Sequence, residues 1–215
     1  MVSNANIKLI HQMVRKRGYG FNLFNPLQEP VRGIVIGERH ANYGDYEFQG
    51  ELIRLLGAKL VLHEFYDPNA LPSPSEIVRI AIGWINRWKT EYGADLRSCD
   101  LSGAKIREFH ELVYKFTGGS GYFSDEIDLK TILVDDNKIR EIVMGKLIRK
   151  AIEKTEGIVI AIVGGAHIAP RSGIHPELRG ERAIEIGGRK QIPYITINQD
   201  HKLAHMLEEG AKFFE

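Results

Sequence analysis

The sequence is poor in cysteine and has no excess of charge of either sign. Its 215 residues include one cysteine, Cys99, which excludes an internal disulfide and a zinc site built from several cysteines. A single cysteine is typical of proteins from a reducing compartment. Lys and Arg total 29 against 28 Asp and Glu, a net charge of +1, so no overall charge attracts the chain to nucleic acid or to a membrane surface.

The chain also lacks the patterns that direct a protein into or across a membrane. Residues 1–6 do not combine a basic region with an apolar run, as a signal peptide does. The longest apolar run, 158–163, is far shorter than the roughly 18 residues that span a bilayer. These absences predict a cytoplasmic protein with no membrane or nucleic-acid partner.

What the sequence does contain is an alternation of apolar strands and amphipathic helices. Strands are expected at 34–36, 60–62, 158–163, 183–186 and 194–197, and helices at about 45–56, 77–88, 104–116, 136–154 and 199–212. The run 158–163 is apolar at every position, as a central strand of a parallel sheet is. The pattern predicts one α/β domain with a mainly parallel central sheet flanked by helices. The strands 34–36 and 60–62, with the helix between them, are expected to pair in parallel through a right-handed crossover.

Residues 68–125 are predicted to form a helical cap inserted into this domain. A turn rich in proline and serine, 68–75, leads into a helix with Trp84 and Trp88 on its apolar face, so we interpret the two indoles as packing residues rather than as a ligand platform. The glycine loop at 118–121 lacks the Gly-Lys-Ser/Thr ending of a P-loop. It is interpreted as a hinge or lid.

Two histidine motifs led by glycine follow predicted strands. Gly37-Glu38-Arg39-His40 follows the first strand, and Gly164-Gly165-Ala166-His167 follows the run 158–163. The glycines are expected to let the backbone turn sharply after each strand. Because ligands of open parallel sheets bind outside the carboxyl ends of the strands, the two motifs are expected to face one cleft.

The strand 60–62 brings a further histidine and glutamate to the same edge. His63 and Glu64 point to opposite faces if the strand is still extended there, so only one of them is expected to join the site. Glu64, which lies nearer the edge, is the preferred residue.

Imidazoles with a carboxylate suit a divalent metal ion such as manganese, cobalt or zinc. We expect His40, His167 and Glu64 to be the ligands. Without a metal, the same groups would serve as general base and acid.

The remaining histidines are weaker candidates. His175 lies in a loop after the second motif and is a secondary ligand candidate. His201 and His205 have metal-ligand spacing, but Lys202 stands where the zinc-protease motif His-Glu-x-x-His has glutamate. A solvated helix face is therefore the favoured interpretation of that pair.

The motifs in this order resemble the TraB/TIKI superfamily, which also includes the haem-binding ChaN-like lipoproteins and the erythromycin esterases. Four parts of this sequence match the pattern of that group. They are the motif at 37–40, a strand ending in Glu64, the helical segment Arg140-Glu141-Ile142-Val143-Met144, and the motif at 164–167. The resemblance covers about 33–168. The segment 67–125 lies outside the pattern and is expected to shape substrate choice.

The resemblance implies an α/β fold and a site made of five residues: Glu38, His40, Glu64, Arg140 and His167. It gives Arg140 the role of a fixed cation that would hold a carboxylate or the oxyanion of a transition state. Spacing alone favours a surface salt bridge for this arginine. The chemistry of the superfamily ranges over metal-dependent peptide cleavage, ester hydrolysis and haem binding.

Two functions follow from these patterns. The first is a metal-dependent hydrolase that cleaves a peptide or ester bond in a small-molecule or peptide substrate. The alternative is a non-catalytic protein that binds a small ligand or haem on the same fold. The sequence leaves the substrate, the identity of the metal and the oligomeric state open.

Overall fold

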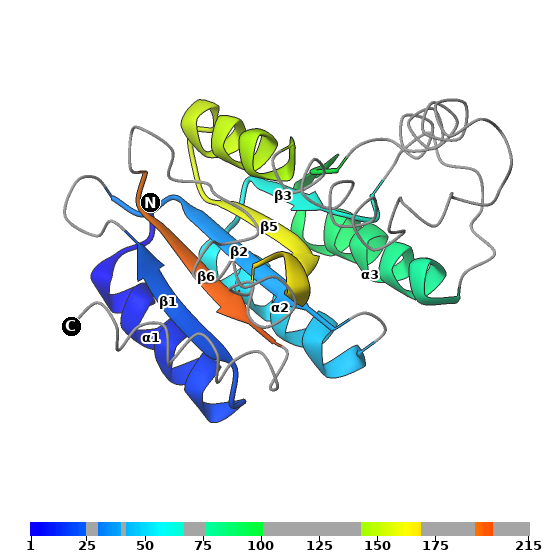
Figure 1. Cartoon of the computed structure of the whole chain (residues 1–215), viewed down its shortest axis with the longest axis horizontal. Helices are drawn as coiled ribbons and strands as arrows, with labels where there is room; N and C mark the ends of the chain where they lie inside the picture. Colours follow the sequence, from blue (N-terminus) through cyan, green and yellow to red (C-terminus); the bar gives the residue numbers. More distant parts are fainter. Residues whose placement is uncertain (25–29, 40–41, 67–75, 101–142, 169–191, 200–215) are drawn as a thin grey trace, which may run out of the picture.

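The computed structural model describes residues 1–24, 30–39, 42–66, 76–100, 143–168 and 192–199 (Figure 1). These residues form an α/β fold around a six-stranded sheet with the strand order β1-β6-β2-β5-β3-β4. The strands are β1 (Gly20–Phe24), β2 (Gly33–Glu38), β3 (Leu60–His63), β4 (Asp95–Ser98), β5 (Val159–Gly164) and β6 (Tyr194–Asn198). All neighbouring strands are parallel except β1, which runs antiparallel to β6.

Helices cover both faces of the sheet (Figure 1). One face packs against α1 (Asn4–Lys16), α2 (Tyr43–Leu56) and α3 (Glu76–Tyr92), and the other packs against a helix over 143–154. Ile34 and Ile36 of β2 point into the first core and Val35 into the second. This alternation is why β2 and β5 are buried at every residue.

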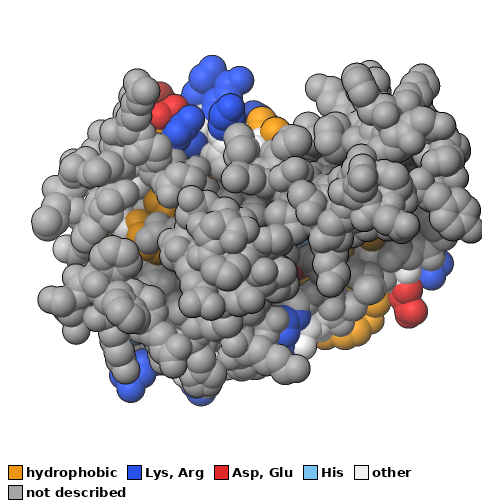
Figure 2. All heavy atoms as spheres, in the orientation of Figure 1, with side chains coloured by type: hydrophobic (Ala, Val, Ile, Leu, Met, Phe, Trp, Pro, Cys, Tyr) orange, Lys and Arg blue, Asp and Glu red, His pale blue; other side chains and the backbone are white. Residues whose placement is uncertain are grey.

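The helix over 143–154 shows how sequence spacing selects the buried face. Its fully or nearly fully buried residues recur every four positions: Met144, Ile148 and Ile152. Each of these residues is followed two positions later by an exposed lysine: Lys146, Lys150 and Lys154. In Figure 2, blue Lys and Arg side chains gather along the outer edge at the place of this helix. Such a one-sided pattern belongs to a helix that packs on a sheet and faces solvent with its other side.

The ends of α2 are set by its flanking residues. The side chain of Asn42 accepts a hydrogen bond from the backbone N–H of Asp45 at 3.2 Å and caps the first turn. Gly57 ends the helix in the left-handed conformation with φ of 56°. The start of α2 is therefore fixed close to the end of β2, where the first histidine motif lies.

The connectivity differs from the expected pairing in one respect. β2 and β3 are parallel, but β5 lies between them and pairs with both. A strand that is apolar on both faces takes a central place in the sheet because both of its faces are then covered. The two glycine-led motifs thus begin on neighbouring strands, β2 and β5.

Part of the predicted cap belongs to the sheet and its core. In α3, Ala81, Ile85 and Trp88 are buried in the same core as α2, and β4 pairs with β3 at the edge of the sheet. An apolar helical stripe next to an open sheet face buries most surface by packing on it. The rest of the predicted cap, residues 68–75 and 101–125, lies outside the described residues.

Of the other predicted elements, some lie within the described residues and some lie outside them. β6 matches the strand expected at 194–197, and β1 has no counterpart among the predicted strands. The helix expected at 104–116, the loop at 118–121, the strand at 183–186 and the part of the last helix after residue 199 are outside the described residues. Of the helices in the described ranges, none is long and apolar enough to cross a membrane.

Candidate functional site

The carboxyl ends of β2, β5 and β3 meet at one edge of the sheet. In the register of the parallel strands Glu38 lies opposite Gly164, and His63 lies opposite Ile162. Gly164 is also the residue whose backbone N–H binds the Glu64 side chain. The two carboxylates, Glu38 and Glu64, therefore flank the end of β5.

Glu64 and His167 form the first acid–imidazole pair of this edge. Oε2 of Glu64 accepts a hydrogen bond from the N–H of Gly164 at 2.7 Å, and Oε1 lies 3.5 Å from Nε2 of His167. His167 reaches this position because β5 runs directly into a short 3-10 turn, Gly165–His167. The side chains are 6% and 13% exposed, so the pair lies just below the surface.

Glu38 and His63 form a second pair, more deeply buried than the first. Oε1 of Glu38 is 3.8 Å from Nε2 of His63, and both side chains are 1% exposed. His63 and Glu64 thus both take part in the arrangement, against the expectation that only one of them would. The reason is that β3 ends at His63 and the chain turns at Glu64, so the alternation of an extended strand no longer separates the two side chains.

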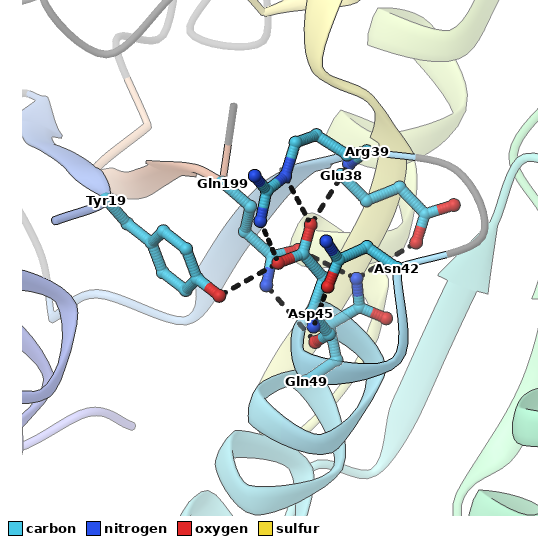
Figure 3. Close-up of polar contacts among 7 residues, drawn as sticks. All are labelled: Tyr19, Glu38, Arg39, Asn42, Asp45, Gln49 and Gln199. Carbon is cyan, nitrogen blue, oxygen red and sulfur yellow. Dashed lines mark hydrogen bonds and ion pairs between the residues drawn. The ribbon is translucent and has the colours of Figure 1, made fainter. Parts of the chain in front are cut away.

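Arg39, which lies between Glu38 and His40 in the first motif, is held by Asp45 (Figure 3). Asp45 is fully buried and accepts hydrogen bonds from Arg39 through its backbone N at 3.3 Å, Nε at 3.1 Å and Nη2 at 2.9 Å. Tyr19 donates its hydroxyl to the same carboxylate at 2.8 Å. Burial, followed by the hydrogen bond to Asp45, raises the pKa of Tyr19 to about 12. We call the cluster of Tyr19, Arg39 and Asp45 the clamp. It fixes the backbone at Arg39, which precedes His40 in the sequence.

Two buried glutamines connect Glu38 to the elements around it (Figure 3). Nε2 of Gln49 donates to Oε2 of Glu38 at 2.9 Å and to Oε1 of Gln199 at 2.8 Å. Gln199 in turn donates its Nε2 to the carbonyl oxygen of Asp45 at 3.1 Å and its backbone N–H to that of Gly37 at 2.8 Å. Sequence reasoning missed both glutamines. The one signal for Gln49 is its place on the apolar face of α2, one position after Phe48.

Gly37 is needed for close approach rather than for a sharp turn. It lies inside β2, and the described glycines with positive φ are Gly18, Gly57 and Gly93. A Cβ at Gly37 would lie 2.9 Å from the Cα of Gly165 and 2.6 Å from Cδ1 of Ile168. The missing side chain therefore lets β2 lie against the turn that carries His167.

Two of the five predicted site residues, His40 and Arg140, lie outside the described residues, as do His175, His201 and His205. Met144, the last residue of the arginine segment, is buried in the helix over 143–154. Within the described ranges no group of three or more His, Cys, Asp or Glu side chains is placed to hold a metal ion. The predicted three-ligand site depends on His40 and stays a prediction.

The two described members of that ligand set have a spacing that fits a metal ion. Donors that are each about 2.1 Å from a tetrahedral ion lie roughly 3.4 Å apart. Oε1 of Glu64 and Nε2 of His167 are 3.5 Å apart, which is long for a hydrogen bond. This donor pair is compatible with one shared ion and equally with a carboxylate that orients an imidazole.

Comparison with known proteins adds no assignment: no family model matches the chain, and no curated protein or solved structure is significantly similar to it. The family resemblance therefore stays a prediction.

Proposed function

We propose that the protein is a hydrolase of peptide or ester bonds whose site lies at the edge formed by β2, β5 and β3. The observation that supports this most directly is the Glu64–His167 pair, in which the N–H of Gly164 fixes the carboxylate and the carboxylate faces the imidazole. Without a metal ion, a fixed carboxylate beside a histidine holds the ring in one orientation and makes it a stronger base.

In this proposal Glu64, His167 and His40 hold one divalent ion, with manganese, cobalt and zinc as the candidates. Such an ion would lower the pKa of a bound water and would polarise the substrate carbonyl. The 3.5 Å between Oε1 of Glu64 and Nε2 of His167 would let both atoms bind the same ion. Arg140 is the proposed cation for a substrate carboxylate or for the oxyanion of the transition state.

Glu38 is the proposed proton carrier. Its carboxylate is almost fully buried, and it lies across Gly164 from Glu64 in the sheet register. A carboxylate in this position takes a proton from the attacking water and delivers it to the leaving group. The alternative is a protein that binds a small ligand or haem on the same residues without turnover.

The test combines metal analysis with a panel of peptide and ester substrates, applied to protein purified without chelator. We expect up to one ion per chain in the wild type, and loss of both the ion and hydrolysis in His167→Ala and Glu64→Gln. His11→Ala is the matched control, because His11 is an exposed histidine on α1.

The outcomes separate the candidate functions. Hydrolysis that resists chelators but is lost in His167→Ala would indicate the metal-free mechanism with the same pair. Binding of haem or of a small ligand without turnover would favour the alternative. Wild-type hydrolysis in His167→Ala would exclude the pair from the site.

A further inference from the structure

The ring of His63 is held in a single orientation. Its side chain is buried at the last residue of β3, between Phe65 and Trp88, whose ring centroids are 5.9 Å and 6.3 Å from that of the imidazole. The backbone N–H of Phe65 donates to Nδ1 of His63 at 3.1 Å. An N–H can only donate, so Nδ1 must carry a lone pair, and the proton of the neutral ring is on Nε2.

That Nε2–H faces Glu38. The distance from Nε2 to Oε1 is 3.8 Å, longer than a hydrogen bond, but such contacts often tighten only when a substrate is bound. The other oxygen, Oε2, already accepts from Gln49 at 2.9 Å. Two neutral N–H groups therefore face the two oxygens of one buried carboxylate.

The orientation of the Gln49 amide, which makes the other contact to Glu38, is fixed by a backbone carbonyl. The carbonyl oxygen of Asp45 can only accept, so the amide nitrogen of Gln199 lies toward it and the amide oxygen lies toward Gln49. Gln49 must then present its nitrogen to Gln199 and to Glu38. The hydrogen-bond chain thus delivers a donor, not an acceptor, to Glu38.

We propose that His63 is a positioning residue for Glu38: as a neutral Nε2–H donor fixed by the Phe65 N–H, it holds one carboxylate oxygen while Gln49 holds the other. The catalytic consequence rests on the proposed hydrolase function, in which Glu38 carries the proton. His63 orients the carboxylate and does not itself transfer a proton.

The first test measures the tautomer of His63 and needs no substrate. The full-length chain is labelled with ¹⁵N, and long-range ¹H–¹⁵N correlation spectra are recorded for the histidine side chains. The His63 signals are those missing from His63→Gln. We expect the pattern of a neutral ring with the proton on Nε2. A proton on Nδ1 or a mixture of tautomers would overturn the proposal.

The second test compares His63→Leu with His63→Gln in the hydrolysis assay. Leucine removes the donor, and we expect kcat to fall about 10–100-fold with KM within a few-fold, as for other residues that orient a catalytic group. Glutamine keeps an N–H at a similar reach and should restore most of kcat. His11→Gln is the control, and thermal unfolding verifies that each variant is folded.

The two tests fail separately. His63→Leu with wild-type kcat would overturn the proposal even if the protein is a hydrolase. If no substrate is cleaved, the proposed function fails, and the tautomer of His63 still decides whether Glu38 faces a fixed donor. If His63→Leu does not fold, the tautomer and the rescue by glutamine remain decisive.

Discussion

Asp45 has no exposed surface, yet its carboxylate accepts four hydrogen bonds, three of them from Arg39 and one from Tyr19. A buried charge is tolerated only when it is paired and hydrogen-bonded. The Arg39 side chain is 33% exposed, so solvent screens part of the ion pair. This cluster should therefore stabilise the first motif strongly, but less than a fully buried pair would.

Asp45→Asn should lower the free energy of unfolding by about 2–3 kcal/mol, because it removes the charge that Arg39 pairs with and offers the donors a poorer acceptor. Urea unfolding at neutral pH measures the change. Asp95→Asn is the control, since the Asp95–Arg97 pair is 56% and 66% exposed and should change stability by under about 0.5 kcal/mol. Equal effects of the two substitutions would contradict the importance of the clamp.

The Tyr19 hydroxyl makes the clamp sensitive to alkaline pH. Its pKa is raised from 10.0 to about 12 by burial and by Asp45, so the folded state holds this proton more tightly than the unfolded chain does. The stability that it contributes is fully present below pH 10 and is lost as the pH rises toward about 12.

Tyr19→Phe lacks this contribution at every pH. We expect the difference in unfolding free energy between wild type and Tyr19→Phe to be largest below pH 10 and to shrink as the pH rises toward about 12. Urea unfolding at a series of pH values measures it, with Tyr43→Phe, at an exposed tyrosine, as the control. A difference that stays constant with pH would show that Tyr19 does not donate to Asp45.

At the scale of single residues, the sequence indicated part of the candidate site. It singled out Glu64 and His167, which the structure brings together, because each directly follows an apolar strand. It gave no reason to select Gln49 or Gln199, and it preferred Glu64 over His63, although the structure places both beside a partner. Their contacts depend on where a helix side chain, a strand end and a turn meet in space, and no spacing along one element encodes that.

At the scale of the elements, β2 packs closely against the turn after β5 at Gly37. The strand itself was predictable from its apolar run, but the role of the glycine was not. The sequence indicated a sharp turn, whereas the described backbone continues through Gly37 as a strand. The neighbour that makes a side chain impossible there, Gly165, is far away in the sequence, so local pattern cannot reveal it.

Gly37→Ala should lower stability by about 1–3 kcal/mol, the usual cost of overpacking, because its Cβ would meet the backbone at Gly165 and the side chain of Ile168. It should also reduce metal binding or hydrolysis by displacing His167. Thermal unfolding and the metal assay measure the two effects.

Gly83→Ala is the control for this substitution. Gly83 lies on α3, and a Cβ added there would meet no described atom within 4 Å. The alanine should therefore be neutral or stabilising by up to about 1 kcal/mol. A stable, active Gly37→Ala protein would disprove the close approach.

At the scale of the whole molecule, labelling of Cys99 can report on unfolding. This thiol, the single one in the chain, is fully buried in the core beneath the helix over 143–154. Burial raises the pKa of Cys99 well above its ordinary value, and the nearby Glu64 and Asp100 carboxylates raise it further. The reactive thiolate is therefore both hidden and disfavoured.

Alkylation of Cys99 in the native protein should be slower than that of a free thiol by on the order of 1,000-fold or more, because labelling requires an opening that costs about 5 kcal/mol. The rate should rise with urea in parallel with unfolding. Glutathione under the same conditions is the reference. Labelling at the free-thiol rate without denaturant would show that this core opens independently of the rest.

The central position of β5 also has a consequence for the order in which the protein is made. The ribosome releases β2, α2 and β3 long before Val159 emerges. Yet β2 and β3 do not pair with each other, and β5 joins them by pairing with both. Until then the edges of β2 and β3 that later pair with β5 are open to wrong partners. Such long-range pairing slows folding, and Glu64 meets His167 only after most of the chain has been translated.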